Sequence, residues 1–427
     1  MKRILLLFAF CPVLALAAGV AESAPVWNGR EDFENGITTL HNPATPMAAE
    51  ASVLRPDPMW RIGGEDDPAG TLFGLVTDAR PTPTGTTWLL DSVLSTLYEV
   101  AADGQVLRTV GREGDGPGEF RNAVSLAVLP DRGVGVVEMM PSQMVRFDAD
   151  GLPQSSVSLG GDGGGQALVQ EVAVHGDEMV MGFFSTNFAA GTAEINRVLG
   201  VYDLEGHEKA KVLHESETQS GGSISLSAGE DGDFINNWTV GADGNVHVHR
   251  KRKEYLIETF APDGTPLRRV RRDYESVRRP EAVLAAEREQ RERMRERFST
   301  HAEMHIEEMA PDIDRIIPRP DGSLWVLSSR GRDAGGSGCV GVFDEIDPAG
   351  RFVRQVRIEV DYDAEDDQFL IRGDRLYVLK EANNAPDRTF SGGGGMMMVQ
   401  MSSGRAEDDE DEDKEPAPYE VICYRLD

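Results

Sequence analysis

An internal repeat is the feature that most limits what this chain can fold into. Residues 86–111 and 133–158 each contain an apolar strand, an acidic residue, a serine, a second strand and an Asp-Gly turn. The acidic residues are Asp91 and Glu138, and the turns are Asp103-Gly104 and Asp150-Gly151. Asp-Gly between alternating apolar and polar residues is typical of a β-hairpin, because such a turn needs positive φ. The repeated unit is therefore a small antiparallel sheet.

The rest of the chain repeats this unit more loosely. Further turns of the same kind are Glu205-Gly206, Asp263-Gly264 and Ala349-Gly350. An apolar strand that leads through a turn into another strand occurs six times. Six units of short strands predict an all-β fold, a six-bladed β-propeller with four-stranded blades.

The two ends of the repeat predict how the ring closes. The last unit, "YEVICYRLD", stops after its third strand, whereas "PMWRIGG" at residues 58–64 resembles the fourth strand "VLRTVG" at residues 106–111. We expect Met59 to Ile62 to complete the last blade, because an unclosed ring would leave an unpaired strand edge.

Two segments interrupt the propeller, which we assign to residues 58–427. Residues 279–311 are rich in strong helix formers and predict a helical insertion. Residues 383–418 contain glycines, methionines and an acidic run, a composition that predicts a disordered loop within the last blade. The segment before the propeller, residues 22–57, is expected to be partly irregular, with a short strand at "GITTLHN".

The first 21 residues are typical of a secretory signal peptide. Lys2 and Arg3 precede an apolar run that ends in small residues, and the run is too short for a comfortable membrane span. The mature protein is therefore expected to be periplasmic or extracellular, with no transmembrane segment. Cys339 and Cys423 lie in apolar, strand-like runs and are expected to be buried thiols. Export leaves a disulfide between them as the alternative.

The net charge of −30 excludes two classes of partner. Nucleic acids and anionic membrane surfaces both require basic patches, so we expect neither as a ligand. Residues 250–253 and the arginines that follow make one blade locally basic. Solvated charge along a strand edge and docking of an anionic partner are both compatible with that pattern. We expect a soluble monomer.

The stretch "GREGDGPGEF" at residues 111–120 is a second feature, besides the repeat, that resembles a known family. Together with the blade pattern, it resembles the link between blades in exported bacterial six-bladed propellers of NHL-repeat type. The resemblance implies that the link joins the outer strand of one blade to the inner strand of the next. Many members of that family are binding platforms, while some relatives are lyases or lactonases, so the fold alone does not choose between them.

The glycines of this link do not predict a phosphate site. A phosphate-binding loop needs a positive field and usually a following helix. Here Glu113, Asp115 and Glu119 surround the single Arg112, and a strand follows. We expect these four charged residues to project from one rim of the ring, where they form a candidate recognition surface.

Metal or catalytic chemistry has only weak candidates in this sequence. His301 and His305 lie four residues apart on a predicted helix, a spacing that can bind zinc only with further ligands from elsewhere. His247 and His249 share one side of a strand, where packing between blades is the alternative to a metal site or a catalytic base. Asp312 and Asp314 are candidate inward-facing carboxylates, but one pair supplies too few oxygens for Ca²⁺.

These patterns predict an exported, non-catalytic binding or scaffold protein. Its propeller surface would bind a protein, a peptide or a glycan, with no catalytic residues and no cofactor. The alternative is a lyase or lactone hydrolase that uses a divalent metal ion at the mouth of the propeller channel.

Overall fold

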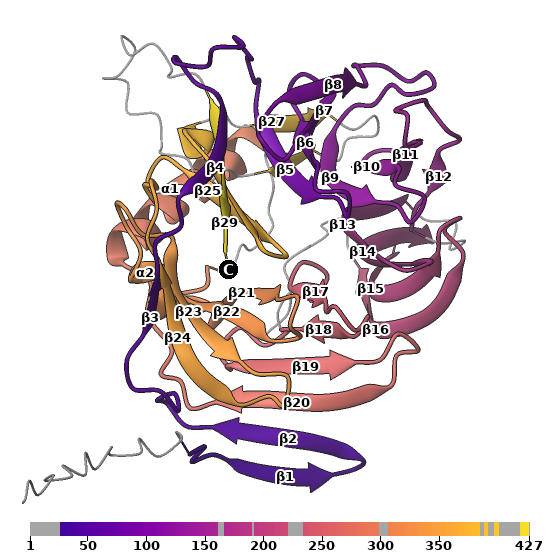
Figure 1. The fold of residues 1–427 in the computed structure, drawn as a ribbon. Helices are drawn as coiled ribbons and strands as arrows, with labels where there is room; N and C mark the ends of the chain where they lie inside the picture. Colours follow the sequence, from indigo (N-terminus) through magenta and orange to yellow (C-terminus); the bar gives the residue numbers. More distant parts are fainter. Residues whose placement is uncertain are drawn as a thin grey trace, which may run out of the picture.

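The chain forms a ring of six sheets (Figure 1). The computed structural model describes residues 26–160, 166–189, 192–220, 234–298, 306–384, 388–391, 397–400 and 419–426. Within these residues, each of the six large sheets is built around four antiparallel strands. The prediction of an all-β, six-bladed propeller is therefore confirmed.

The first three blades follow one another along the chain. Blade 1 contains β5 (Val76–Pro81), β6 (Thr87–Asp91), β7 (Thr96–Val100) and β8 (Val106–Val110). Blade 2 contains β9 (Ala123–Val128), β10 (Val134–Glu138), β11 (Gln143–Phe147) and β12 (Val157–Ser158). Blade 3 has longer strands, β13 (Gln166–His175), β14 (Glu178–Ala189), β15 (Thr192–Asp203) and β16 (Glu208–Ser220).

The last three blades carry the additions to the ring. Blade 4 contains β17 (Trp238–Val240), β18 (Val246–Val248), β19 (Leu256–Phe260) and β20 (Pro266–Arg272). Blade 5 contains β21 (Ile313–Pro318), β22 (Leu324–Ser328), β23 (Gly341–Ile346) and β24 (Phe352–Ile358). Blade 6 contains β25 (Gln368–Arg372), β26 (Arg375–Leu379), β29 (Glu420–Arg425) and β4 (Pro58–Gly63).

The Asp-Gly turns join the third and fourth strands of their blades, as predicted. Gly104 and Gly151 have φ of +91° and +78°, and the loose copies at Gly206, Gly264 and Gly350 have φ of +87°, +85° and +90°. Each of these glycines occupies a left-handed backbone conformation that side chains disfavour. The repeat in the sequence thus marks one corner of each of five blades.

Ring closure occurs where the sequence predicted it. β4 pairs antiparallel with β29, with Ile62 opposite Val421 and Trp60 opposite Cys423. Trp60 and Ile62 are 7% and 3% exposed and pack in the core between blades 6 and 1. The prediction for residues 59–62 is therefore confirmed, since a strand from the start of the ring completes its last blade.

The chain before β4 runs along the outside of the ring, a segment called here the N-terminal strap (residues 30–57). β1 (Arg30–Glu34) and β2 (Ile37–Asn42) form a hairpin, and β2 pairs in parallel with β20. β3 (Ser52–Leu54) pairs in parallel with β24, and Figure 1 shows the strap passing from β20 past β24 to β4. The strand expected at "GITTLHN" is confirmed as β2. Because β2 covers β20, the arginines of β20 do not lie on a free strand edge.

One buried amide fastens the strap to two blades. Asn42 is 1% exposed, and its Nδ2 donates to the carbonyls of Arg271 (3.1 Å) and Gly350 (3.0 Å). Its Oδ1 accepts from the backbone N–H of Phe352 (2.8 Å) and from Trp27 Nε1 (2.8 Å). Because every polar atom of the side chain is paired, this buried amide stabilises the contact between strap, blade 4 and blade 5.

The helical insertion lies between blades 4 and 5, as predicted. α1 spans Glu281–Phe298 and follows Pro280, and Leu284 is its fully buried anchor. The residues near the end of the insertion are not helical. They form backbone hydrogen bonds with the residues that precede the helix. Arg279 N–H donates to the Glu308 carbonyl (2.9 Å), and Ala310 N–H donates to the Val277 carbonyl (2.8 Å).

The second insertion falls largely outside the described residues. Within the predicted disordered range 383–418, the structure has part of the short 3-10 turn η1 (Ala382–Asn384) and a hairpin of β27 (Arg388–Ser391) and β28 (Met397–Gln400). The acidic run on which the expectation depended lies outside the described residues.

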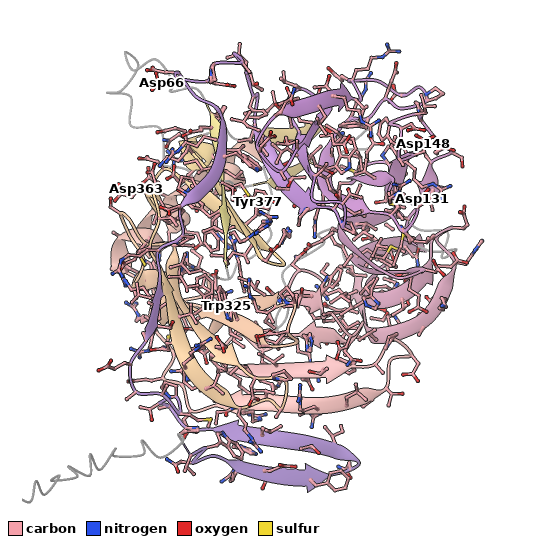
Figure 2. The ribbon with its side chains drawn as sticks, in the orientation of Figure 1. Asp66, Asp131, Asp148, Trp325, Asp363 and Tyr377 are labelled. Atoms are coloured by element: carbon pink, nitrogen blue, oxygen red, sulfur yellow. The ribbon has the colours of Figure 1, made fainter. Side chains whose placement is uncertain are left out.

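The core lies between the blades rather than at one centre. Large side chains such as Tyr377 of β26 and Trp325 of β22 pack between neighbouring sheets. Both residues are labelled in Figure 2. Cys339 and Cys423 are free thiols, 2% and 0% exposed, which confirms the expectation of buried thiols. Burial raises the pKa of Cys423 to about 12. In the described part of the chain, no helix has the length and apolar character needed to span a bilayer.

Candidate functional site

The glycine-rich stretch connects β8, the outer strand of blade 1, to β9, the inner strand of blade 2. Glu119 holds its fold: Oε1 accepts from Arg112 Nε (2.7 Å), and Oε2 accepts from the backbone N–H of Gly116 (2.9 Å). Phe120 is fully buried in the core of blades 1 and 2. Gly111 and Gly118 have φ of +87° and +74°. The loop is therefore a structural link with a defined conformation.

The four predicted recognition residues divide into two kinds. The side chain of Glu119 is 20% exposed, and its pKa is lowered by the hydrogen bonds from Gly116 and Arg112. The side chains of Arg112, Glu113 and Asp115 are 79%, 73% and 86% exposed. Glu119 thus supports the loop from within, while the other three present charge to solvent.

A second link of the same kind joins blade 6 to blade 1. Gly63 has φ of +82°, and a Cβ there would collide with Phe73, as one at Gly111 would with Phe120. The carboxylate of Asp67 accepts from the backbone N–H groups of Gly63 (3.1 Å), Ala69 (2.9 Å) and Thr71 (2.9 Å). The sequence signal was available but imperfect, since "GGEDDPAGTLF" also runs from glycine to phenylalanine but is one residue longer than the first link.

The acidic residue of the repeat stabilises these links. Asp91 is fully buried and accepts backbone N–H bonds from Gly74 (2.6 Å), Leu75 (3.1 Å), Val93 (3.0 Å) and Leu94 (2.9 Å). It therefore ties the link before β5 to the turn between β6 and β7.

Glu138 occupies the same place in blade 2. Its carboxylate accepts from the Arg121 N–H (2.5 Å) and from Gln143 Nε2 (2.6 Å), and burial raises its pKa. The acidic residue of the repeat thus has a structural role in both blades.

Of the histidines predicted as weak metal candidates, His247 and His249 belong to the described residues, and neither is part of a group that could hold a metal ion. His301 and His305 lie outside the described residues. His247 and His249 are 6% and 3% exposed and contact Thr259 Oγ1 (3.0 Å) and the Leu256 carbonyl (3.4 Å), respectively. Burial lowers the pKa of each to about 4. Among the residues that the structure describes, no three His, Cys, Asp or Glu side chains are grouped to hold a metal ion.

The two buried histidines make a prediction about pH. Below pH 6.5 the unfolded chain takes up protons that the folded imidazoles, with pKa of about 4, do not accept. The free energy of unfolding should therefore fall as pH drops from 6.5 to 4, by about 2 kcal/mol per histidine at pH 5. Urea unfolding at pH 7 and pH 5 measures this loss. The His247→Asn and His249→Gln variants should each show a smaller loss than the parent protein, and identical losses would contradict the assignment.

The carboxylates predicted to face inward together have separate environments. Asp312 precedes β21 and is 1% exposed, and burial raises its pKa. Asp314 accepts a hydrogen bond from Arg332 Nη1 (2.7 Å) in α2 (Ser329–Asp333). The pairing of β21 with β22 shifts register between Ile313 and Arg315, so simple alternation does not apply there. The expected shared face for the two carboxylates is wrong.

A different set of charges meets at the centre of the ring. Asp78 of β5 is 2% exposed and contacts Arg80 Nε (3.0 Å), Arg372 Nη2 (3.2 Å) and the Leu126 N–H (2.9 Å). Burial alone would raise the pKa of Asp78, but the two guanidiniums and the Leu126 N–H outweigh it and hold this pKa below its usual value. Asp78 thus joins the inner strands of blades 1, 2 and 6.

Glu171 extends this set across the ring. It lies on β13 of blade 3, with Oε1 3.1 Å from Arg80 Nη2 and 3.9 Å from Arg372 Nη2. Blades 3 and 6 are opposite each other in a six-bladed ring, so these side chains meet across its axis. We call Asp78, Arg80, Glu171 and Arg372 the axial cluster.

The insertions of the propeller all lie on one of its two faces. Strand direction alternates within each blade, so the links between blades and the turns between second and third strands share one face, called here the link face. On it lie α1, α2, the hairpin β27–β28 and the extended ends of β14 and β15. The opposite face, called the Asp-Gly face, carries the short turns.

The link face also exposes apolar side chains. Leu72, Val93 and Leu94 are 72%, 44% and 47% exposed. Leu72 belongs to the link before β5, and the other two belong to the turn between β6 and β7, the two loops that Asp91 ties together. These three residues, called here the apolar patch, lie in loops of fixed conformation.

Comparisons with known proteins find only distant structural similarity. Neither a protein-family model nor a curated protein matches the sequence. Among solved structures, a putative exported protein from Bacteroides fragilis is 11% identical, with 88% of this chain and 100% of that chain covered and a TM-score of 0.41. The calcium-binding protein regucalcin from Agrobacterium tumefaciens is 14% identical, with 88% and 98% covered and a TM-score of 0.39. YCF48 bound to D1 peptide is 13% identical, with 88% and 98% covered and a TM-score of 0.39. At such identities these proteins assign no ligand or activity to this chain.

Proposed function

We propose that this protein is an exported, non-catalytic binding protein of NHL-repeat type, whose link face receives a protein or peptide partner. The observation that carries the proposal is the placement of the insertions and the apolar patch on that one face. The stability of the ring does not require insertions, because short turns like those of the Asp-Gly face are enough to join the strands.

The chemistry of the link face fits a peptide-like partner. The apolar patch offers three large side chains, and exposed apolar residues that cluster are typical of protein interaction sites. The charged residues Arg112, Glu113 and Asp115 lie in the next link around the ring. An apolar centre with a charged margin is the usual composition of a protein interface.

The fixed loop conformation supports the same conclusion. Four backbone N–H groups of the two patch loops donate to the single carboxylate of Asp91. Loops held in this way lose little conformational entropy on binding, which favours affinity.

Selection of displayed peptides on the immobilised protein tests the proposal. Selected peptides should bind the parent protein, and binding should weaken about tenfold or more in the Leu72→Ser/Leu94→Ser variant, because each buried apolar contact contributes about 1–2 kcal/mol. Leu152, 60% exposed in the Asp-Gly turn of blade 2, supplies the control Leu152→Ser on the other face. Peptides that lose affinity for the control alone would contradict the proposal.

The enzyme alternative is tested by metal analysis of the purified protein. A tightly bound divalent ion on the ring axis, held by three or more side chains, would favour a lyase or lactone hydrolase over a binding protein.

A further inference from the structure

Three arginines lie near the two carboxylates of the axial cluster at the centre of the ring. The axial cluster contains Arg80 and Arg372 with Asp78 and Glu171, and Arg315 of β21 interacts electrostatically with Arg372 and Glu171 of this cluster. Both carboxylates are already shared: Asp78 contacts Arg80 and Arg372, and Glu171 contacts the same pair. The guanidinium of Arg315 is thus a third cation without a carboxylate of its own in the cluster.

Arg315 is poorly compensated by its other neighbours. Its Nη1 donates to the Phe369 carbonyl (3.0 Å), and its guanidinium lies 4.7 Å from the centre of the Phe369 ring. The Asp314 carboxylate is 3.9 Å from its Nε, but that carboxylate hydrogen-bonds Arg332 at 2.7 Å instead. Within the described residues, no carboxylate hydrogen-bonds Arg315.

Arg315 is also open to solvent. Its side chain is 48% exposed, a high value for a residue on the innermost strand of a blade. Glu171 and Arg372 on the inner strands of blades 3 and 6 are 40% and 29% exposed. Solvent therefore reaches the charged side chains that surround the ring axis.

Arg372 has an unused donor. Its Nη2 contacts both axial carboxylates, whereas its Nε is buried without a hydrogen-bond partner among the described residues. A buried unpaired donor costs free energy that a bound acceptor would recover. Arg372 is the last residue of β25, and Arg315 donates to the carbonyl of Phe369, three residues earlier on the same strand.

We propose that the ring axis binds a carboxylate group between Arg315 and Arg372. The flat guanidinium presents paired N–H donors whose spacing matches the two oxygens of a carboxylate. A carboxylate is favoured over a phosphate dianion because Asp78 and Glu171 already place two negative charges nearby. The site goes beyond the proposed function and does not depend on it, since it lies on the axis and not on the apolar patch.

Calorimetry with small acids tests this site on the whole protein. The probes are acetate, succinate, citrate and inorganic phosphate, each titrated at constant pH and ionic strength. At least one carboxylate should bind with a dissociation constant below about 1 mM, and Arg315→Gln should weaken it roughly tenfold or more, because a charged hydrogen bond is lost. Arg354→Gln removes an arginine of similar exposure, 49%, from β24 of the same blade and should leave binding unchanged.

Two further measurements keep the result unambiguous. Arg315→Lys keeps the charge but not the paired donors, and it should bind more weakly than the parent while melting at the same temperature. Comparing a peptide that has a free C-terminal carboxylate with its amidated form shows whether the site binds the C-terminus of a peptide or only small organic acids. Either source of the carboxylate supports the site. Binding of phosphate alone, no carboxylate binding below about 10 mM, or equal binding by Arg315→Gln would overturn it.

Discussion

A chain that begins at Glu65, and therefore lacks β4, should fail to form a stable ring. Blade 6 would keep only β25, β26 and β29, and the edge of β29 would lose its partner. The two buried side chains of β4, Trp60 and Ile62, contribute about 1.5–3 kcal/mol each, before the loss of ring closure is counted. We expect no cooperative thermal unfolding transition by circular dichroism, and aggregates on gel filtration, because an open strand edge pairs with other chains.

A chain that begins at Ser52 is the matched control. It lacks β1, β2 and the contacts of Asn42 but keeps β3 and β4, so the ring still closes. Blade 4 would keep its own four strands. This control should fold as a monomer that melts cooperatively at a reduced temperature. If both truncated chains melt at the same temperature, β4 does not close the ring.

Local patterns predicted the blades because each blade is specified by neighbouring residues. The Asp-Gly turns and alternating strands lie within about 25 residues of each other, and each unit carries its own turn signals. The closing strand was also predictable, because β4 repeats the sequence of a fourth strand and the last unit lacks one. A gap and the segment that fills it can both be seen in the sequence.

The strap was only partly predictable. β2 appears as a short strand, but nothing near it shows that it pairs in parallel with β20, more than two hundred residues away. β1, "REDFE", is fully exposed and has no apolar face to indicate burial. Asn42 helps to fix the strap against blades 4 and 5, through hydrogen bonds that no local pattern predicts.

The axial cluster shows why sites are harder to predict than blades. Asp78 and Arg372 are 294 residues apart, on two strands that no local pattern places side by side. Their meeting follows only once the ring has closed and its inner strands are in register. The available signal was the recurrence of charged residues in inner strands, in "VTDARP", "IDRIIP" and "QFLIR".

The Asp78→Ala variant should lose about 3–5 kcal/mol of unfolding free energy. The substitution leaves Arg80 and Arg372 with only Glu171 between them and removes an acceptor from the Leu126 N–H. A largely buried charge that loses its partner costs far more than the intact pair contributes, because the remaining arginines are only partly hydrated. Urea unfolding monitored by tryptophan fluorescence measures the loss.

The pH dependence of this loss separates charge from packing. The pKa of Asp78 is held below its usual value in the folded protein, so its contribution is present above the unfolded pKa of about 4 and is lost as pH falls through the folded pKa. The difference between parent and variant should therefore be full at pH 7 and shrink below pH 4. Asp263→Ala, in an exposed Asp-Gly turn, is the control and should cost less than about 1 kcal/mol. If Asp78→Met/Arg372→Met, which replaces both partners by apolar side chains, is no more stable than Asp78→Ala, the cost comes from lost packing and the electrostatic account of the axial cluster is wrong.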